Sequence, residues 1–227
     1  MSASKIIPTK PLLIMLYGFP GSGKTHFVRQ LTEVLQTAHI HADRMRMDLF
    51  EQPRYDRQEN DVLMQLMDYM TGEFLDAGMS VIYDMNAMRT KQRHAMRELA
   101  RKHGAQPLLV WLQLDVESAY ARIAKRDRRK LDDKYAMPLD RTTFEKICSF
   151  MQNPLPTEDY VVVSGKHVFR TQFGSVIKRL HDLKLVSIGE MQNNVPRPAL
   201  VNLIPQPNKA GLSGGRFDNT RRNVIIR

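Results

Sequence analysis

The sequence predicts an α/β protein built on a doubly wound parallel sheet. Apolar runs of strand length alternate with amphipathic helical patterns five times along the chain. The first run, residues 12–17, leads directly into a glycine-rich turn and then a helical pattern. Because strands joined through helices lie parallel in one sheet, we expect five parallel strands with helices on both faces.

The composition is that of a globular protein with one main domain. Of the 227 residues, 42% are hydrophobic and 26% are charged, and no apolar run approaches the roughly 20 residues of a membrane-spanning helix. We expect a leader at residues 1–10, a core domain at residues 11–186 and a basic, extended or disordered tail at residues 187–227. We expect no signal peptide, and with the single Cys148 a reducing cytoplasm is expected.

The formal net charge of +10 favours polyanionic partners. Residues 191–227 contribute six basic side chains and one acidic side chain. A solvated basic tail and a contact with nucleic acid explain this excess equally well.

The strands are expected where apolar runs lie between turn residues. The run at 108–114 is continuous, as in a central parallel strand, whereas His39 and His41 alternate with apolar residues, as on a half-exposed strand. Metal binding by these two histidines is an alternative, and ordinary surface placement is favoured over it. The expected strands are residues 12–17, 39–42, 81–83, 108–114 and 160–163.

The helices are expected where apolar residues recur at three- and four-residue spacing. Gly78 and Gly104 are expected to end two of them, and Asp140 is expected to be the N-cap of another. The expected helices run from the glycine-rich turn to about residue 36, over 60–77 and 90–103, from 116 onward, from 140 onward and over 173–183.

Residues 18–25 fit the pattern G-x-x-x-x-G-K-[ST] of a phosphate-binding loop. Its glycines let several backbone N–H groups point at one anion, and the N-terminus of the following helix adds partial positive charge. Lys24 can reach the β- and γ-phosphates of ATP, and Thr25 can offer its hydroxyl to Mg²⁺. The expected nucleotide-binding residues are Gly18, Pro20, Gly21, Ser22, Gly23, Lys24, Thr25 and His26.

Asp43 and Asp84 each follow an expected strand, at the sheet edge where open α/β sheets bind ligands. One carboxylate could accept the proton of a hydroxyl group, and the other could orient Mg²⁺ through water. Either residue alone could be a loop or cap residue. Together with the phosphate-binding loop they favour a catalytic site.

The basic run from Arg122 to Lys130 has two interpretations. It is either a solvated helix face or part of a lid, residues 122–138, whose arginines close over the triphosphate. Arg122 and Arg126 are four residues apart and are expected to share one helical face. The loop-rich segment that follows favours the lid.

These features together resemble those of P-loop kinases. The phosphate-binding loop, Asp43-x-x-Arg46, Asp84-x-Asn86 and Arg122-x-x-x-Arg126 follow one another as they do in polynucleotide 5′-kinases and the related AAA-type predicted small kinases. Zeta toxins are more distantly similar. The resemblance covers about residues 11–183 and implies a three-layer P-loop NTPase fold with strand order 2-3-1-4-5.

The resemblance also implies a role for each matching residue. Asp43 would be the general base, and Arg46 would contact the reacting part of the acceptor. Asp84 would orient Arg46 or, with Thr25, the metal. Catalysis would further involve Lys24 and Arg126; ATP would be bound by Arg122 and Arg126; the acceptor would lie near Asp43, Arg46, Asp84, Asn86 and Arg89.

The resulting hypothesis is a kinase that uses ATP and Mg²⁺ to phosphorylate a hydroxyl group of a nucleic-acid 5′ end, a nucleotide or a small metabolite. One alternative is a nucleotide-gated ATPase or binding module that engages nucleic acid or a protein partner. A weaker alternative is a zeta-toxin-like sugar-nucleotide kinase. The sequence does not predict the acceptor, the base preference or the oligomeric state.

Overall fold

The computed structural model describes residues 5–127, 129 and 133–186. The expected tail, residues 187–227, lies outside the described residues, as do residues 1–4 of the leader and four residues of the expected lid.

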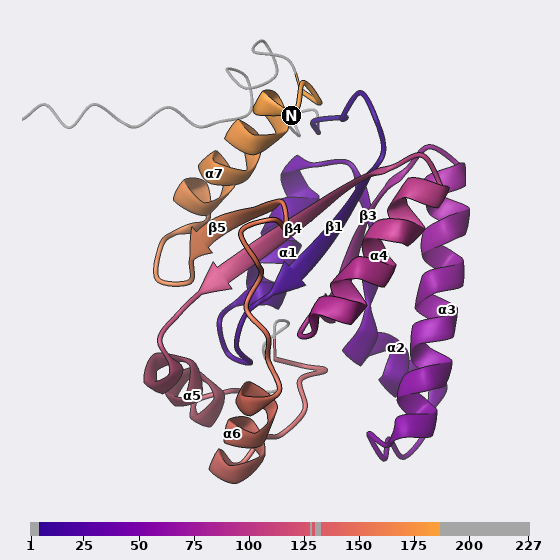
Figure 1. The fold of residues 1–227 in the computed structure, drawn as a ribbon. Helices are drawn as coiled ribbons and strands as arrows, with labels where there is room; N and C mark the ends of the chain where they lie inside the picture. The colour runs from indigo at the N-terminus through magenta and orange to yellow at the C-terminus, as the bar shows by residue number, and fades with distance from the viewer. Residues whose placement is uncertain (1–4, 128, 130–132, 187–227) are drawn as a thin grey trace, which may run out of the picture. The chain divides into compact units, whose positions relative to one another are not determined.

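The predicted α/β architecture is confirmed (Figure 1). All neighbouring strands pair in parallel, in the order β2-β3-β1-β4-β5, which is the order that the family resemblance implies. The strands are β1 (Leu12–Tyr17), β2 (Thr37–His41), β3 (Ser80–Asn86), β4 (Gln106–Gln113) and β5 (Tyr160–Ser164).

Seven helices are found in the described part of the chain, and none of them has the length and apolar character needed to cross a membrane. Side-chain oxygens of Asp56, Asp115 and Asp140 cap three helices by accepting a backbone N–H three residues on. The helices are α1 (Lys24–Val34), α2 (Ala42–Leu49), α3 (Arg57–Asp76), α4 (Thr90–Lys102), α5 (Val116–Ala124), α6 (Arg141–Ser149) and α7 (Phe169–Asp182).

Two helix boundaries differ from the sequence-based expectation in ways that affect the site. Asp43 lies in the first turn of α2, a helix that was not predicted, rather than in a loop. Helix α5 ends at Ala124, so the prediction that Arg122 and Arg126 share a helical face is wrong. The buried apolar side chains of α5 are Ala119 and Ile123, so the apolar face of the helix stops at Ile123. The basic run that follows has no apolar face that could pack against the domain, and packing is what stabilises a short helix.

The sheet is covered on both faces, which gives three layers (Figure 1). Successive side chains of β1 point to opposite faces, as they do along any strand. Leu12, Ile14 and Leu16 belong to the core formed with α1 and α7, whereas Leu13, Met15 and Tyr17 belong to the core formed with α3 and α4.

The second half of the expected leader packs on the domain. Ile6 is buried, donates its backbone N–H to the carbonyl of Val34 and bridges to Leu35, and Thr9 donates to the carbonyl of Leu185. These hydrogen bonds hold the segment before β1 against the end of α1 and against the residues that follow α7.

The pairing of β1 with β3 contains an irregularity where the two strands approach the site. Met15 is paired with Tyr83, but the next residue of β1, Leu16, is paired with Asn86. Strand β3 therefore carries Asp84 and Met85 as extra residues on this side. Such bulges re-aim the side chains around them, and here the bulge brings Asn86 level with the end of β1.

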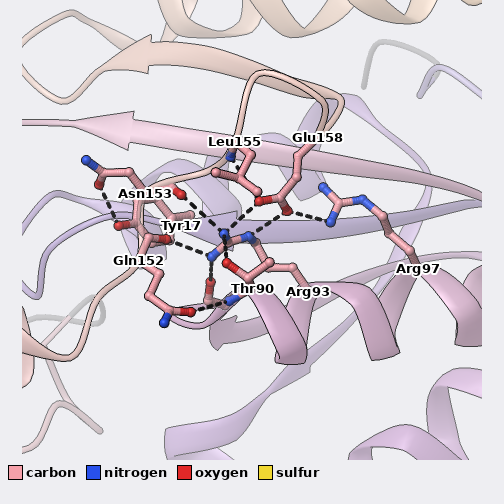
Figure 2. A network of polar contacts seen from close by, with 9 residues as sticks. Tyr17, Thr90, Arg93, Arg97, Gln152, Asn153, Leu155 and Glu158 are labelled. Atoms are coloured by element: carbon pink, nitrogen blue, oxygen red, sulfur yellow. Dashed lines mark hydrogen bonds and ion pairs between the residues drawn. The ribbon is translucent and has the colours of Figure 1, made fainter.

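A buried arginine on α4 ties the two ends of the α6–β5 connection to the sheet. Figure 2 shows Arg93 at the centre of this network, where its guanidinium donates to both carboxylate oxygens of Glu158 at 2.8 and 2.7 Å. It also donates to the carbonyls of Ala87, Gln152 and Asn153, and it lies over the ring of Tyr17. Arg93 is completely buried, so these partners replace the water that its charge has lost.

The pKa of Glu158 reflects the same network. Partial burial alone would raise this pKa, but hydrogen bonds from Arg93, from the backbone N–H of Leu155 and from Arg97 outweigh it and lower the pKa to about 2. A carboxyl group whose pKa is lower in the folded than in the unfolded protein stabilises the fold at pH values above both. The contribution of Glu158 is therefore complete above its ordinary pKa of 4.5 and is lost as the pH falls towards 2.

We predict that Glu158→Gln lowers the free energy of unfolding by roughly 3 kcal/mol near neutral pH, because it leaves the buried charge of Arg93 without its counter-ion. Denaturant unfolding measured along a pH series should show the difference from the wild type shrinking below about pH 4.5, as Glu158 of the wild type also loses its charge.

The matched control is Glu98→Gln on α4, the helix that carries Arg93. It removes the exposed partner of Arg101 and should change stability by less than about 0.5 kcal/mol. Equal losses in the two variants, or a loss in Glu158→Gln that does not depend on pH, would show that Arg93 does not need this carboxylate.

Candidate active site

The phosphate-binding loop has a backbone that only glycine can supply. Gly21 and Gly23 adopt positive φ values of 83° and 98°. A Cβ atom at Gly21 would lie 2.3 Å from the carbonyl oxygen of Ala119, and one at Gly18 would lie 2.5 Å from that of Leu112. The loop is therefore pressed against α5 on one side and the end of β4 on the other.

Lys24 is partly buried inside this loop. Its ammonium group donates to the carbonyl oxygens of Gly18 and Phe19, at 2.8 and 3.0 Å. Burial lowers the pKa of Lys24 to about 8, although the nearby carboxylates of Asp84 and Asp43 act in the opposite direction. A partly desolvated cation that donates to neutral carbonyl oxygens gains from an anionic ligand.

Two observations indicate that the loop fits the phosphates of a nucleotide. The hydroxyl of Ser22 is buried and has no hydrogen-bond partner among the described residues. The cavity also reaches the N-terminus of α1, whose N–H groups favour anions. Lys24, the loop amides and Ser22 would hold the phosphates, and the hydroxyl of Thr25 and the carboxylate of Asp84 are the groups suited to Mg²⁺ and its water shell.

Asn86 fixes the start of the loop. Its side-chain oxygen accepts the backbone N–H of Gly18 at 3.3 Å, and its side-chain nitrogen donates to the carbonyl oxygen of Gly18 at 2.9 Å. One side chain thus satisfies both backbone groups of Gly18. The sequence suggested a contact with the acceptor for Asn86; the structure gives it this clamp as well as a place on the cavity wall.

A single cavity of about 1160 Å³ brings the predicted site residues together. It extends from the phosphate-binding loop to the space between α3 and α4. Every predicted residue lines it except Gly18: Pro20, Gly21, Ser22, Gly23, Lys24, Thr25, His26, Asp43, Arg46, Asp84, Asn86, Arg89, Arg122 and Arg126.

The carboxyl group of Asp43 has a raised pKa. Burial is the main cause and the charge of Asp84 adds to it, while His41, Arg46 and Arg126 oppose it. A carboxylate with a raised pKa is a stronger base than an ordinary aspartate.

Arg46 is held by residues that the sequence analysis did not identify. Its guanidinium pairs with the buried Glu59 at 3.1 Å, donates to Asn60 and lies over the ring of Tyr55. Glu59 in turn accepts the backbone N–H groups of Arg54 and Tyr55. The expected orientation of Arg46 by Asp84 is replaced by this arrangement, because Asp84 points to two histidines of β2 instead.

The two lid arginines approach the cavity from different segments. Arg122, near the end of α5, lies beside Gly23 and donates to the carbonyl of Gly165 at 2.9 Å. Arg126, beyond the helix, donates to the carbonyl of Met137 at 3.2 Å and lies 3.6 Å from Asp133. Both guanidinium groups are therefore positioned by loops and not by a common helical face.

The loop after β5 is a part of the site that the sequence analysis missed. Gly165, Lys166 and His167 line the cavity, and a Cβ atom at Gly165 would lie 2.7 Å from the carbonyl oxygen of Ser22. The available signal was the position of this loop at the carboxyl end of a parallel strand, where ligands bind in such sheets.

The fold is shared with solved structures that include a gluconokinase and a putative kinase. A putative kinase from Chloroflexus aurantiacus is 18% identical, covering 76% of this chain and 97% of its own, with a TM-score of 0.60. A gluconokinase from Sinorhizobium meliloti is 15% identical, covering 77% and 93%, with a TM-score of 0.55. Kti12 from Chaetomium thermophilum, solved in complex with ADP-AlF3, is 16% identical, covering 78% and 100%, with a TM-score of 0.58.

These likenesses show the fold, and the sequence itself shows the family. A search among curated proteins finds no match to this sequence. A family model described as an AAA domain matches residues 13–154, which is more than half of the chain and includes the phosphate-binding loop, Asp43, Asp84 and Arg126. The chain belongs to this AAA-domain family.

Proposed function

We propose that this protein is an ATP-dependent kinase that transfers the γ-phosphoryl group to a hydroxyl acceptor. The observation that carries the proposal is the shared cavity, in which Lys24 and the phosphate-binding loop meet the carboxylate of Asp43. Phosphoryl transfer requires these parts: held phosphates, a group that receives the acceptor's proton and positive charge around the transferred group.

Each residue has a defined task in this reaction. Lys24 and the loop amides hold the β- and γ-phosphates, and Thr25 and Asp84 orient Mg²⁺, which neutralises phosphate charge when bound. Asp43 takes the proton of the acceptor hydroxyl. At the same time the hydroxyl oxygen bonds to the γ-phosphorus, and the bond between the γ-phosphorus and ADP breaks. Arg122 and Arg126 stabilise the charge on the transferred group.

The acceptor is expected in the part of the cavity between α3 and α4. Its wall there is largely apolar, with Met64, Met88, Met96 and Leu99, and it includes Asp68, which accepts a hydrogen bond from the Tyr83 hydroxyl at 2.8 Å. Arg46 and Arg89 also line the cavity. We propose a nucleic-acid 5′ end, a nucleotide or another small metabolite as the acceptor, and the net charge of +10 favours one that carries phosphate.

We predict that Asp43→Asn abolishes phosphoryl transfer, lowering its rate at least about a hundredfold, because the amide cannot accept the hydroxyl proton. The measurement incubates the protein with Mg²⁺, labelled ATP and a panel of acceptors. Binding of ATP should remain within a few-fold of the wild type, because Asp43 does not hold the phosphates.

The matched control is Asp48→Asn on the same helix, α2, where the exposed carboxylate lies 3.6 Å from Arg44. It should leave transfer unchanged. Full transfer by Asp43→Asn would exclude Asp43 as the base, whereas ATP binding by the wild type without transfer to any acceptor would favour a nucleotide-gated binding module.

We also predict that ATP binding takes up protons at alkaline pH. Lys24 has a pKa of about 8 in the free protein, so it is largely neutral at about pH 9. Bound phosphates favour the ammonium form and raise this pKa, so that up to one proton is taken up and affinity falls as the pH rises through 8. Calorimetry in buffers of different ionisation enthalpy measures this uptake.

Lys24→Arg separates this effect from other titrating groups, because arginine stays charged in this range. Any ATP binding that remains in this variant should take up no proton from residue 24. Equal proton uptake by the wild type and Lys24→Arg would contradict the assignment.

A further inference from the structure

Two histidines and one aspartate converge on a point beside the candidate active site. His39 and His41 are two residues apart on β2, so their side chains lie on the same face of the sheet. Asp84 of β3 is the register partner of His41 and lies on that face too. The bulge in β3 leaves this pairing with β2 intact while it shifts the pairing with β1.

The donor atoms of these side chains are close together. The Nε2 atoms of His39 and His41 lie 2.9 and 3.8 Å from the same oxygen of Asp84, Oδ2. All three donor atoms lie within 4.8 Å of one another. The two imidazole rings are stacked, with centroids 5.3 Å apart and an angle of 15° between their planes, so both rings present the same edge to Asp84.

This spacing suits a transition-metal ion. Zinc binds imidazole nitrogen and carboxylate oxygen at about 2.0–2.2 Å, which places tetrahedral donors roughly 3.4 Å apart. Because the observed distances to Asp84 lie on either side of that value, side-chain shifts of less than about 1 Å would complete the set. Two imidazoles and a carboxylate favour an ion such as Zn²⁺, Co²⁺ or Fe²⁺, whereas Mg²⁺ prefers oxygen donors alone.

The cluster is also accessible to an ion. Strand β2 is at the edge of the sheet, and the His39 side chain is 27% exposed while that of Asp84 is 7% exposed. The site is open to solvent on the histidine side and buried on the carboxylate side. Metal sites with such an opening keep one coordination position of the ion for water or substrate.

We infer that His39, His41 and Asp84 form a binding site for a transition-metal ion of the zinc class, distinct from the Mg²⁺ that accompanies ATP. The site shares Asp84 with the cavity wall. An ion held there withdraws this carboxylate from the water shell of Mg²⁺, so the site gives transition metals a means of weakening Mg²⁺–nucleotide binding. This consequence rests on the proposed function; the metal site itself does not.

The test uses the full chain without a histidine tag. Titration with Co²⁺ should give one equivalent of bound ion per chain with visible d–d absorption, and Zn²⁺ should abolish this absorption while millimolar Mg²⁺ should not. His39→Ala and His41→Ala should each weaken Co²⁺ binding more than about tenfold. His94→Ala, an exposed histidine on α4, is the matched control and should bind Co²⁺ like the wild type.

A second measurement does not depend on any variant folding. Of the seven histidines, Zn²⁺ added to the wild type should shift the imidazole NMR signals of two, those of His39 and His41. Absence of Co²⁺ absorption, unchanged signals for these two rings, or stoichiometric binding that survives in the His39→Ala/His41→Ala double variant would each overturn the inference. Metal binding without any transfer activity would leave the site intact and reject only the kinase proposal.

Discussion

The hydrogen bonds between Asn86 and Gly18 determine how the two halves of the site face each other. The phosphate-binding loop follows β1, and the candidate metal and acceptor residues lie on β3 and β2 or directly after them. A buried backbone group that loses its partner costs free energy, and one side chain of β3 binds both backbone groups of Gly18, with Lys24 as a second donor to the carbonyl. The bulge at Asp84 and Met85 supplies the geometry, because without it Asn86 would not be level with the end of β1.

The sheet could be predicted because its information is local. Continuous apolar runs such as residues 108–114 belong to buried parallel strands, and Asp140 and Gly104 mark helix ends by their own chemistry. The missed features depend on what a segment packs against. Helix α2 is short and mostly polar, so its apolar pattern is weak, and the end of α5 is set by where its contact with Phe144 and Leu114 ends.

The site was predictable to the extent that its residues lie in a motif or at a strand end. The spacing of residues 18–25 and the positions of Asp43 and Asp84 were sufficient to find residues that now line one cavity. The partners of these residues were not predictable in this way. Glu59 reaches Arg46 from the next helix, and His39 reaches Asp84 across two strands whose register is fixed by the whole sheet.

The distribution of charge explains why these partners matter. Glu59 neutralises the charge of Arg46, and Asp84 contacts the histidines of β2. Neither Arg46 nor Asp84 therefore determines the net electrostatic field of the cavity by itself. Lys24 and Arg122 instead donate to carbonyl oxygens, which leaves their positive charge available where phosphates would lie. The carboxylate of Asp43 lines the same cavity. The proposed transfer would use both kinds of group: the cationic side chains would stabilise the phosphates of the nucleotide, and the carboxylate would receive the proton of the acceptor hydroxyl.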